Sequence, residues 1–216
     1  LQNRSLWLGH VSCLNDRSEI QYGQQLIDSI FREATQKEGL EEVRIFIQQL
    51  FYWIEVFACQ NIHHPFVASF CKSGNLLSQW RAYSHSGQGY CIGFEFSAKT
   101  LITSDLLALA KGKEPFLRKV IYDQTVQKDL VHSYLTGVIT AVKVALGVGG
   151  LKLPELQSNL AVMAIQSANI LSDMVMCFKH PAFMSEEEWR LIRVTRDDFE
   201  PKGIQFRESI GGLVPY

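Results

Sequence analysis

The chain has 216 residues, a formal net charge of −1 at pH 7 and 47% hydrophobic residues, as expected for a globular protein with a buried core. The near-neutral charge argues against nucleic-acid binding as the main function. No apolar run approaches the roughly 20 residues that span a bilayer, and no signal peptide opens the chain. We therefore expect a cytoplasmic protein without a membrane partner.

Both ends of the chain look cut. The first residues stand directly before an apparent strand at residues 5–8, and the last residues, 214–216, come without a closing element. We expect a single α+β domain over residues 1–216, with further segments outside it at both ends.

The first part of the chain predicts a strand and two helices. A short strand is expected at residues 6–11. Asp16 followed by Glu19 has the pattern of a capping box at a helix start. Apolar residues then recur at helical spacing over 26–31 and 40–59. These two helices are expected to form an N-terminal helical hairpin.

The rest of the chain mixes strands and helices. Alternating or apolar segments predict strands at residues 66–72, 90–96, 117–122, 188–194 and 204–207. Helical spacing is found at residues 76–83, 126–147 and 156–178. The order shows no regular β-α-β alternation. It predicts an α+β fold with a mostly antiparallel sheet, continuous or split, and several packed helices.

Residues 69–94 are dense in polar and aromatic groups and are expected to wall a pocket. Trp80 and Tyr83 offer rings that can stack on a nucleobase or nicotinamide, and Arg81 offers a bidentate grip on a phosphate. The alternative is that both rings belong to the core and that Arg81 pairs with a nearby acid.

Residues 185–194 place three carboxylates before an aromatic and apolar strand. In an extended chain Glu188 and Arg190 share one face and Trp189 lies on the other. The pattern predicts a Glu–Arg pair at a sheet edge or mouth, where Arg190 orients the acid or contacts a cofactor. Apolar neighbours would raise the pKa of Glu188 for acid chemistry, or Glu188 would anchor a ribose hydroxyl. The alternative is an ion pair of Glu188 with Arg190 or Arg193.

Cysteine and histidine residues predict no metal site. The five cysteines are widely spaced without a C-x-x-C pair, which predicts reduced, mostly buried thiols. The spacing of Cys59, His63, His64 and Cys71 matches no standard zinc module. Neither Cys71 nor Cys91 has a recognisable base beside it in the sequence.

Two further patterns bear on ligand binding. Asn15 and Asp16 are most simply explained as a helix cap, although Asn15 is also a candidate for presenting a polar group to a ligand. No glycine loop of the Walker type is present. The glycines at 87–93 enter a predicted strand rather than a helix, so they are not the dinucleotide fingerprint.

Several segments occur together in a characteristic order: Leu6-Trp7-Leu8, Leu14-Asn15-Asp16, Ser69-Phe70, Gln79-Trp80-Arg81-Ala82-Tyr83, Gly89-Tyr90-Cys91-Ile92-Gly93-Phe94 and Glu186-x-Glu188-Trp189-Arg190. In this combination the chain resembles the bacterial family called domain of unknown function 2971, from about Leu6 to Tyr216. The resemblance implies a bacterial cytoplasmic protein and no particular activity.

A second resemblance is to mono-ADP-ribosyltransferases, which bind NAD in a split sheet through three strand motifs. Ser69 resembles the hydroxyl residue of their second motif, and Glu188 in Glu186-x-Glu188 resembles the catalytic Glu of the third. The first motif, a His or Arg, is not found between Leu1 and Tyr216. The resemblance implies that Glu188 bonds the nicotinamide ribose and supports an oxocarbenium-like transition state.

Three functions remain open on this reasoning. The first is a non-catalytic sensor or interaction module of a defence or stress system, with a small nucleotide or a protein as partner and no required cofactor. The second is an NAD-using ADP-ribosyltransferase or glycohydrolase. The third is a nuclease that binds magnesium through Glu186, Glu188 and Asp16, against which the charge balance argues.

The NAD-using hypothesis assigns a role to each candidate residue. Its catalytic residues are Glu188 and Ser69, and its cofactor contacts are Trp80, Arg81, Tyr83, Asn15 and Arg190. Convergence of Ser69, Glu188 and Arg81 on one cleft would favour an enzyme. Dispersal of these groups, or their sealing by mutual hydrogen bonds, would favour a binding module.

Overall fold

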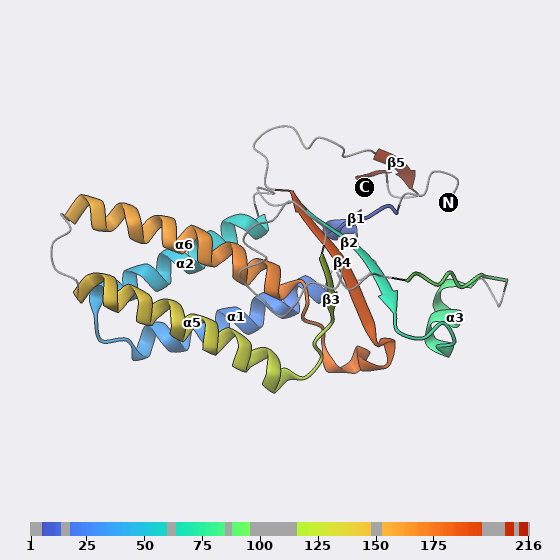
Figure 1. Ribbon diagram of the computed structural model, residues 1–216, viewed down its shortest axis with the longest axis horizontal. Coiled ribbons are helices and arrows are strands. Elements are labelled where there is room, and N and C mark those ends of the chain that lie inside the picture. The colour runs from blue at the N-terminus through green and yellow to red at the C-terminus, as the bar shows by residue number, and fades with distance from the viewer. Residues whose placement is uncertain are drawn as a thin grey trace. The chain divides into compact units, whose positions relative to one another are not determined.

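A computed structural model of the chain describes residues 6–13, 18–59, 64–84, 88–95, 116–147, 153–195, 206–209 and 212–215 (Figure 1). Contacts along the chain divide it into two units. One comprises Leu1–Arg17, His63–Tyr122 and Lys179–Tyr216 and holds the sheets, and the other comprises Ser18–Ile62 and Asp123–Phe178 and holds the long helices. The predicted α+β fold class is confirmed, and the single domain stays a prediction.

The helical unit is a bundle in which each long helix contacts the other three (Figure 1). Its helices are α1 Ser18–Lys37, α2 Glu41–Cys59, α5 Gln124–Gly147 and α6 Leu153–Val175. The predicted helical hairpin is therefore present as α1 and α2, joined by residues 38–40.

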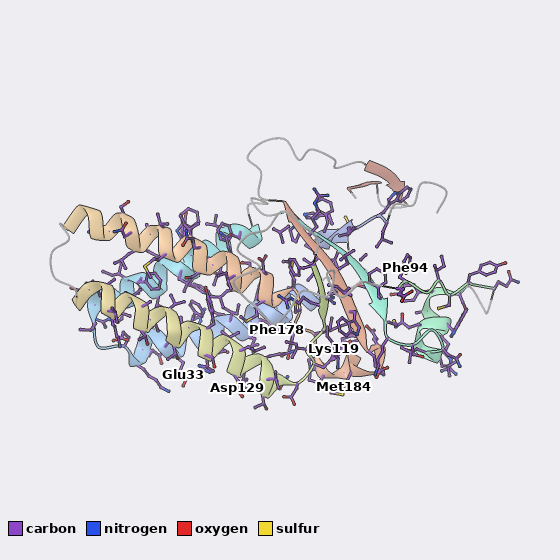
Figure 2. All side chains as sticks on the ribbon, in the orientation of Figure 1. Glu33, Phe94, Lys119, Asp129, Phe178 and Met184 are labelled. Carbon is purple, nitrogen blue, oxygen red and sulfur yellow. The ribbon has the colours of Figure 1, made fainter. Side chains whose placement is uncertain are left out.

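Apolar side chains at helical spacing form the core of this unit. Those that are almost fully buried include Ile27, Phe31, Val43, Phe46, Ile47, Leu50, Val131, Val142 and Leu171. Figure 2 shows the contrast between the buried Phe178 and the exposed Glu33 and Asp129 of the outer surface. The hydrophobic effect on these side chains is the main stabilising contribution to the bundle.

Helix α5 combines a clear start with a narrow buried stripe. The carboxylate of Asp123 accepts hydrogen bonds from the backbone N–H groups of Thr125 (2.8 Å) and Val126 (3.2 Å), which caps the helix. The residues of α5 that are buried are Gln127, Val131, Leu135 and Val142.

The expectation that no segment has the length and composition of a membrane span is wrong, because α5 is long and apolar enough to cross a membrane. One such helix is weak evidence for a membrane span, because a core helix of a soluble protein meets the same criterion, although such a helix is mostly buried and the apolar window of α5 is 17% buried. Here α5 contacts the other three helices of its bundle.

Helix α1 passes so close to α6 that position 23 has no room for a methyl group. A Cβ atom on Gly23 would lie 2.4 Å from Cγ1 of Val175, a buried side chain with a stiff χ1 torsion. We expect Gly23→Ala to lower the free energy of unfolding by about 1–3 kcal/mol through overpacking, measured by urea denaturation.

A matched glycine in α5 separates this clash from helix propensity. A Cβ atom on Gly137 would meet nothing within 4 Å, so Gly137→Ala should raise the free energy of unfolding by about 0.5–1 kcal/mol. Stabilisation by both substitutions would show that α1 and α6 are not packed as closely as described.

The other unit is built on an open antiparallel sheet with the strand order β1-β2-β4-β3. Its strands are β1 Gly9–His10, β2 His64–Cys71, β3 Phe116–Lys119 and β4 Glu188–Thr195. Among its described residues, the short helices are η1 Val11–Cys13, α3 Leu77–Tyr83 and η2 Pro181–Glu186. A separate hairpin pairs β5 Phe206–Ser209 with β6 Gly212–Pro215.

Two expectations about strands are wrong. Residues 90–95, the described part of the strand predicted at 90–96, form none. The two places beside β2 in the sheet are taken by β1 and β4, and the apolar side chains of the segment stay exposed, with Tyr90 at 96%. Strand β6 is also a closing element that was not expected at the end of the chain.

Candidate functional site

Strand β4 carries Glu188 and Arg190 into the interior of the sheet. The register pairs Cys71 with Glu188 and Ser69 with Arg190. Directly paired residues of antiparallel strands lie on the same face, so these four side chains share one face while Trp189 lies on the other. The predicted common face of Glu188 and Arg190 is confirmed. Of its two predicted places, a sheet edge or a mouth, the edge is wrong, because β4 lies between β2 and β3, whereas Glu188 is the first residue of β4, at the end of the strand.

Both carboxylate oxygens of Glu188 are engaged by cations. Oε1 accepts a hydrogen bond from Nε of Arg190 at 2.7 Å, and Oε2 accepts one from Nη2 of Arg190 at 3.1 Å. Oε2 also accepts a hydrogen bond from Nζ of Lys179 at 2.9 Å. The side chains of Glu188, Arg190 and Lys179 are only 5–6% exposed. A bidentate guanidinium grip in a dry site is among the stronger polar contacts of proteins.

The pair extends into a wider network, which we call the buried charge cluster: Lys179, Glu186, Glu188 and Arg190. Nζ of Lys179 also donates to Oε2 of Glu186 at 2.5 Å. The hydroxyl of Tyr122 accepts a hydrogen bond from the backbone N–H of Glu188 at 3.0 Å. Two carboxylates and two cations balance, which is the condition under which charges tolerate burial.

Electrostatics in the cluster keep Glu188 ionised. Burial by itself would raise the pKa of Glu188, but the hydrogen bonds and charge of Arg190, a hydrogen bond from Ser69 and the charge of Lys179 hold that pKa below its ordinary value. The sequence-based expectation of a raised pKa for Glu188 is therefore wrong, because the two cations outweigh the apolar neighbours.

The pKa values of two groups near Glu188, the Cys71 thiol and the Tyr122 hydroxyl, are also shifted. Burial, together with the charges of Glu188 and Glu186, raises the pKa of the Cys71 thiol. Burial also raises the pKa of Tyr122. A protonated thiol is a poor nucleophile, so this environment does not activate Cys71.

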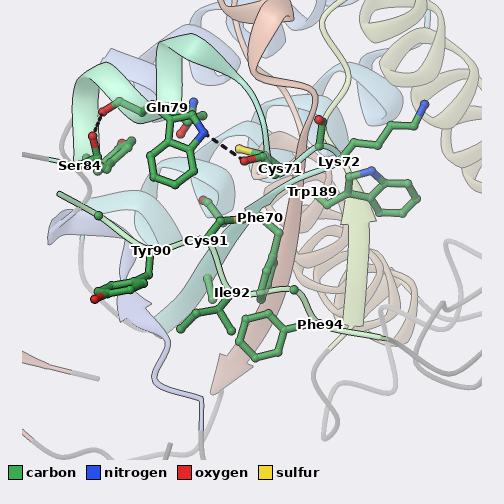
Figure 3. Close-up of a pocket in the computed structure, with 18 of the residues that line it drawn as sticks. Phe70, Cys71, Lys72, Gln79, Ser84, Tyr90, Cys91, Ile92, Phe94 and Trp189 are labelled. Atoms are coloured by element: carbon green, nitrogen blue, oxygen red, sulfur yellow. Dashed lines mark hydrogen bonds between the residues drawn. The ribbon is translucent and has the colours of Figure 1, made fainter. Parts of the chain in front are cut away.

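A pocket of about 750 Å³ opens in the same unit (Figure 3). Residues from β2, α3 and the segment 88–95 line it, with one residue each from β3 and β4. Its aromatic residues are Phe70, Trp80, Tyr83, Tyr90, Phe94 and Trp189, and its other residues include Ser69, Cys71, Lys72, Gln79 and Cys91. The volume is that of a typical small-molecule site.

Local contacts fix the walls of this aromatic pocket. The indole N–H of Trp80 donates a hydrogen bond to the carbonyl of Gly74 at 3.2 Å. The rings of Phe70 and Phe94 meet edge to face with centroids 5.5 Å apart, a favourable aromatic geometry. A Cβ atom on Gly89 would lie 2.8–2.9 Å from Cβ and Cα of Ser84, so the chain can pass this closely over the end of α3 only with a glycine there.

The cysteines are less buried than expected. Among those whose burial is described, only Cys177 is buried, whereas Cys71 is half-buried and Cys13 and Cys91 are exposed. Two of them, Cys71 and Cys91, line the aromatic pocket.

The structure brings some of the predicted site residues together and separates others. Ser69 hydrogen-bonds Glu188, and it lines the aromatic pocket together with Trp80 and Tyr83. Arg190 belongs to the buried charge cluster. Arg81 is exposed and is not among the residues that line the pocket.

Asn15, the cofactor-binding candidate from the N-terminal region, lies outside the described residues. So does Asp16, the third ligand of the magnesium hypothesis. Within the described part of the chain, no group of three or more His, Cys, Asp or Glu side chains is placed to hold a metal ion. The catalytic and binding roles given to all these residues stay predictions.

Sequence reasoning missed two members of the site. Lys179 is nine residues from Glu188 and is brought back to it by η2, and Tyr122 is 66 residues away. No periodicity connects such positions. The left-handed backbone of Glu187, with φ 44°, turns the chain from η2 into β4 and has no signature in the sequence either.

Comparison with known proteins finds one family. Residues 79–191 match the model of the family described as "Protein of unknown function (DUF2971)". The match takes in most of α3, the segment 88–95 and the buried charge cluster, and it is shorter than the span of the resemblance drawn from the sequence. No curated protein and no solved structure matches the chain.

Proposed function

The chain belongs to the DUF2971 family of proteins of unknown function, and from that premise we propose that it is a non-catalytic sensor module that binds a small molecule in the aromatic pocket. One observation carries the proposal. Both carboxylate oxygens of Glu188 accept hydrogen bonds from Arg190 and Lys179, whereas the pocket is lined by aromatic side chains that a ligand can reach. A reactive acid needs contact with its substrate, and Glu188 is 4% exposed.

Exposed apolar side chains around the pocket support the same proposal. Tyr83, Tyr90, Ile92 and Phe94 all line it and all are exposed. Soluble proteins rarely expose large apolar side chains together unless something binds there. A ligand that covers these rings would remove their apolar surface from water. The cytoplasmic location and the defence or stress setting stay predictions.

The NAD-using enzyme remains a second candidate because of one contact. Ser69 hydrogen-bonds Glu188 and is also among the residues that line the pocket, so it connects the pocket lining with the acid. In an enzyme of this kind, binding of NAD would have to displace Arg190 or Lys179 from the carboxylate. Nicotinamide release measures that possibility directly.

The test combines binding with turnover on the same proteins. Binding is followed with N-phenyl-1-naphthylamine, a neutral aromatic probe whose fluorescence rises in apolar sites, and turnover by chromatography of nicotinamide released from millimolar NAD. We expect binding in the wild type, at least ~10-fold weaker binding in Trp80→Ala and in Phe94→Ala, as expected for loss of a stacking wall, and no release of nicotinamide.

Tyr52→Ala is the matched control, because Tyr52 is an exposed aromatic residue of α2 that does not line the pocket. It should leave probe binding unchanged. If wild type releases nicotinamide and Glu188→Gln releases it at least ~100-fold more slowly, the sensor-module hypothesis is wrong and the NAD-using enzyme is supported. Probe binding that is equal in wild type and both pocket variants would remove the pocket as the site.

A further inference from the structure

The charges on the pocket wall restrict which small molecules it can hold. Lys72 is the only charged residue among the described residues that line the pocket, and Asp and Glu are missing from that lining. Resting on the proposed function, we propose that the ligand is a planar aromatic molecule that carries one anionic group, a carboxylate or a phosphate.

The aromatic part of the ligand is specified by fixed rings. Phe70 on β2, Trp80 on α3 and Phe94 come from three segments, and the first and last are in edge-to-face contact. The indole of Trp80 is oriented by its hydrogen bond to Gly74. Rings that are held before the ligand arrives lose little entropy on binding, which favours a flat partner that stacks on them.

The anionic group of the ligand is inferred from the one cation of the described pocket lining that can pair with it, Lys72. Lys179 and Arg190 are neutralised by Glu186 and Glu188 within the buried charge cluster. Lys72 is exposed and has no ion pair among the described residues.

The position of Lys72 suits this role. Its backbone N–H donates to the carbonyl of Glu187 at 3.2 Å, which anchors the chain at the end of β2. In Figure 3 the side chain extends on the side of Trp189 and points away from the rings of Tyr90 and Phe94. An ammonium on a flexible stem can turn to meet an anion at the rim, and the amide of Gln79 adds a neutral donor to the lining. A cationic ligand would find no carboxylate there.

Three naphthalene probes that share one ring system test the inference by calorimetry: naphthalene-2-carboxylate, naphthalene-2-carboxamide and 2-naphthylmethylammonium. We expect the carboxylate to bind about 5- to 10-fold more tightly than the carboxamide, as for a charge-assisted contact at a partly exposed rim, and the ammonium to bind most weakly. The preference for the carboxylate should shrink at high salt.

Two lysine variants test whether Lys72 causes the preference for the carboxylate probe. Lys72→Gln should remove the preference for the carboxylate without changing the affinity for the carboxamide, whereas Lys128→Gln, an exposed position on α5, should change neither. Tightest binding of the ammonium probe, or a preference for the carboxylate that survives Lys72→Gln, would overturn the inference. Binding of the carboxamide without any preference for the anion would also overturn it and would leave the proposed function standing, whereas binding of none of the probes would overturn both.

Discussion

Replacing Glu188 with glutamine is expected to lower the free energy of unfolding by about 3–5 kcal/mol at pH 7, the loss found when one partner of a buried ion pair is removed. The substitution keeps the shape of the side chain and removes the negative charge that both Arg190 and Lys179 contact. Those two cations would then be buried with Glu186 as their only carboxylate in the cluster, and its side chain is 25% exposed. Urea denaturation followed by circular dichroism measures the difference.

Two further variants show whether the loss comes from the cluster. Glu187→Gln changes a neighbouring exposed carboxylate and should alter the free energy of unfolding by less than about 0.5 kcal/mol. Adding Arg190→Met to Glu188→Gln should recover part of the loss, because it removes one of the uncompensated cations. A loss below about 1 kcal/mol in Glu188→Gln would contradict a structural role and would favour an acid retained for chemistry.

The part of the fold that follows from local spacing could be predicted from the sequence. The 3.6-residue period of apolar side chains identifies the four long helices, and the two-residue period of strands places Glu188 and Arg190 on one face. It also places Ser69 on a strand, although its pairing with Arg190 is a matter of register. Alternation alone failed at residues 90–95, because a strand also needs a neighbouring backbone to pair with.

The contacts that decide the character of the site are not local. Lys179 reaches Glu188 only because η2 and the left-handed Glu187 return the chain to the start of β4. Burial by itself would raise the pKa of that carboxyl, and the sequence did not show how closely Arg190, Ser69 and Lys179 contact it. The hydrophobic wall of the pocket, by contrast, was visible in the sequence as the aromatic density of residues 69–94.

The free energy of unfolding of wild type exceeds that of Glu188→Gln at pH 7, and this difference is expected to fall as the pH decreases from 5.5 to 3. The pKa of Glu188 is lowered in the folded chain, and in the unfolded chain it is about 4.3. A lowered folded pKa gives stability that is complete above the unfolded pKa and is lost as the pH falls through the folded one. Urea denaturation of both proteins at pH 7, 5.5, 4 and 3 measures the difference.

The comparison with Glu188→Gln isolates one group among several that titrate. The pKa values of Glu33 and Glu38 are lowered as well, by Lys37 and Lys143, but both residues are present in both proteins and their contributions cancel. A difference that stays constant with pH would mean that the pKa of Glu188 is the same in the folded and the unfolded chain, so that the cluster does not stabilise its charged form. A difference that grows as the pH falls would mean that the folded chain holds Glu188 protonated, which is the state required of a general acid. That result would favour the NAD-using enzyme over the sensor module.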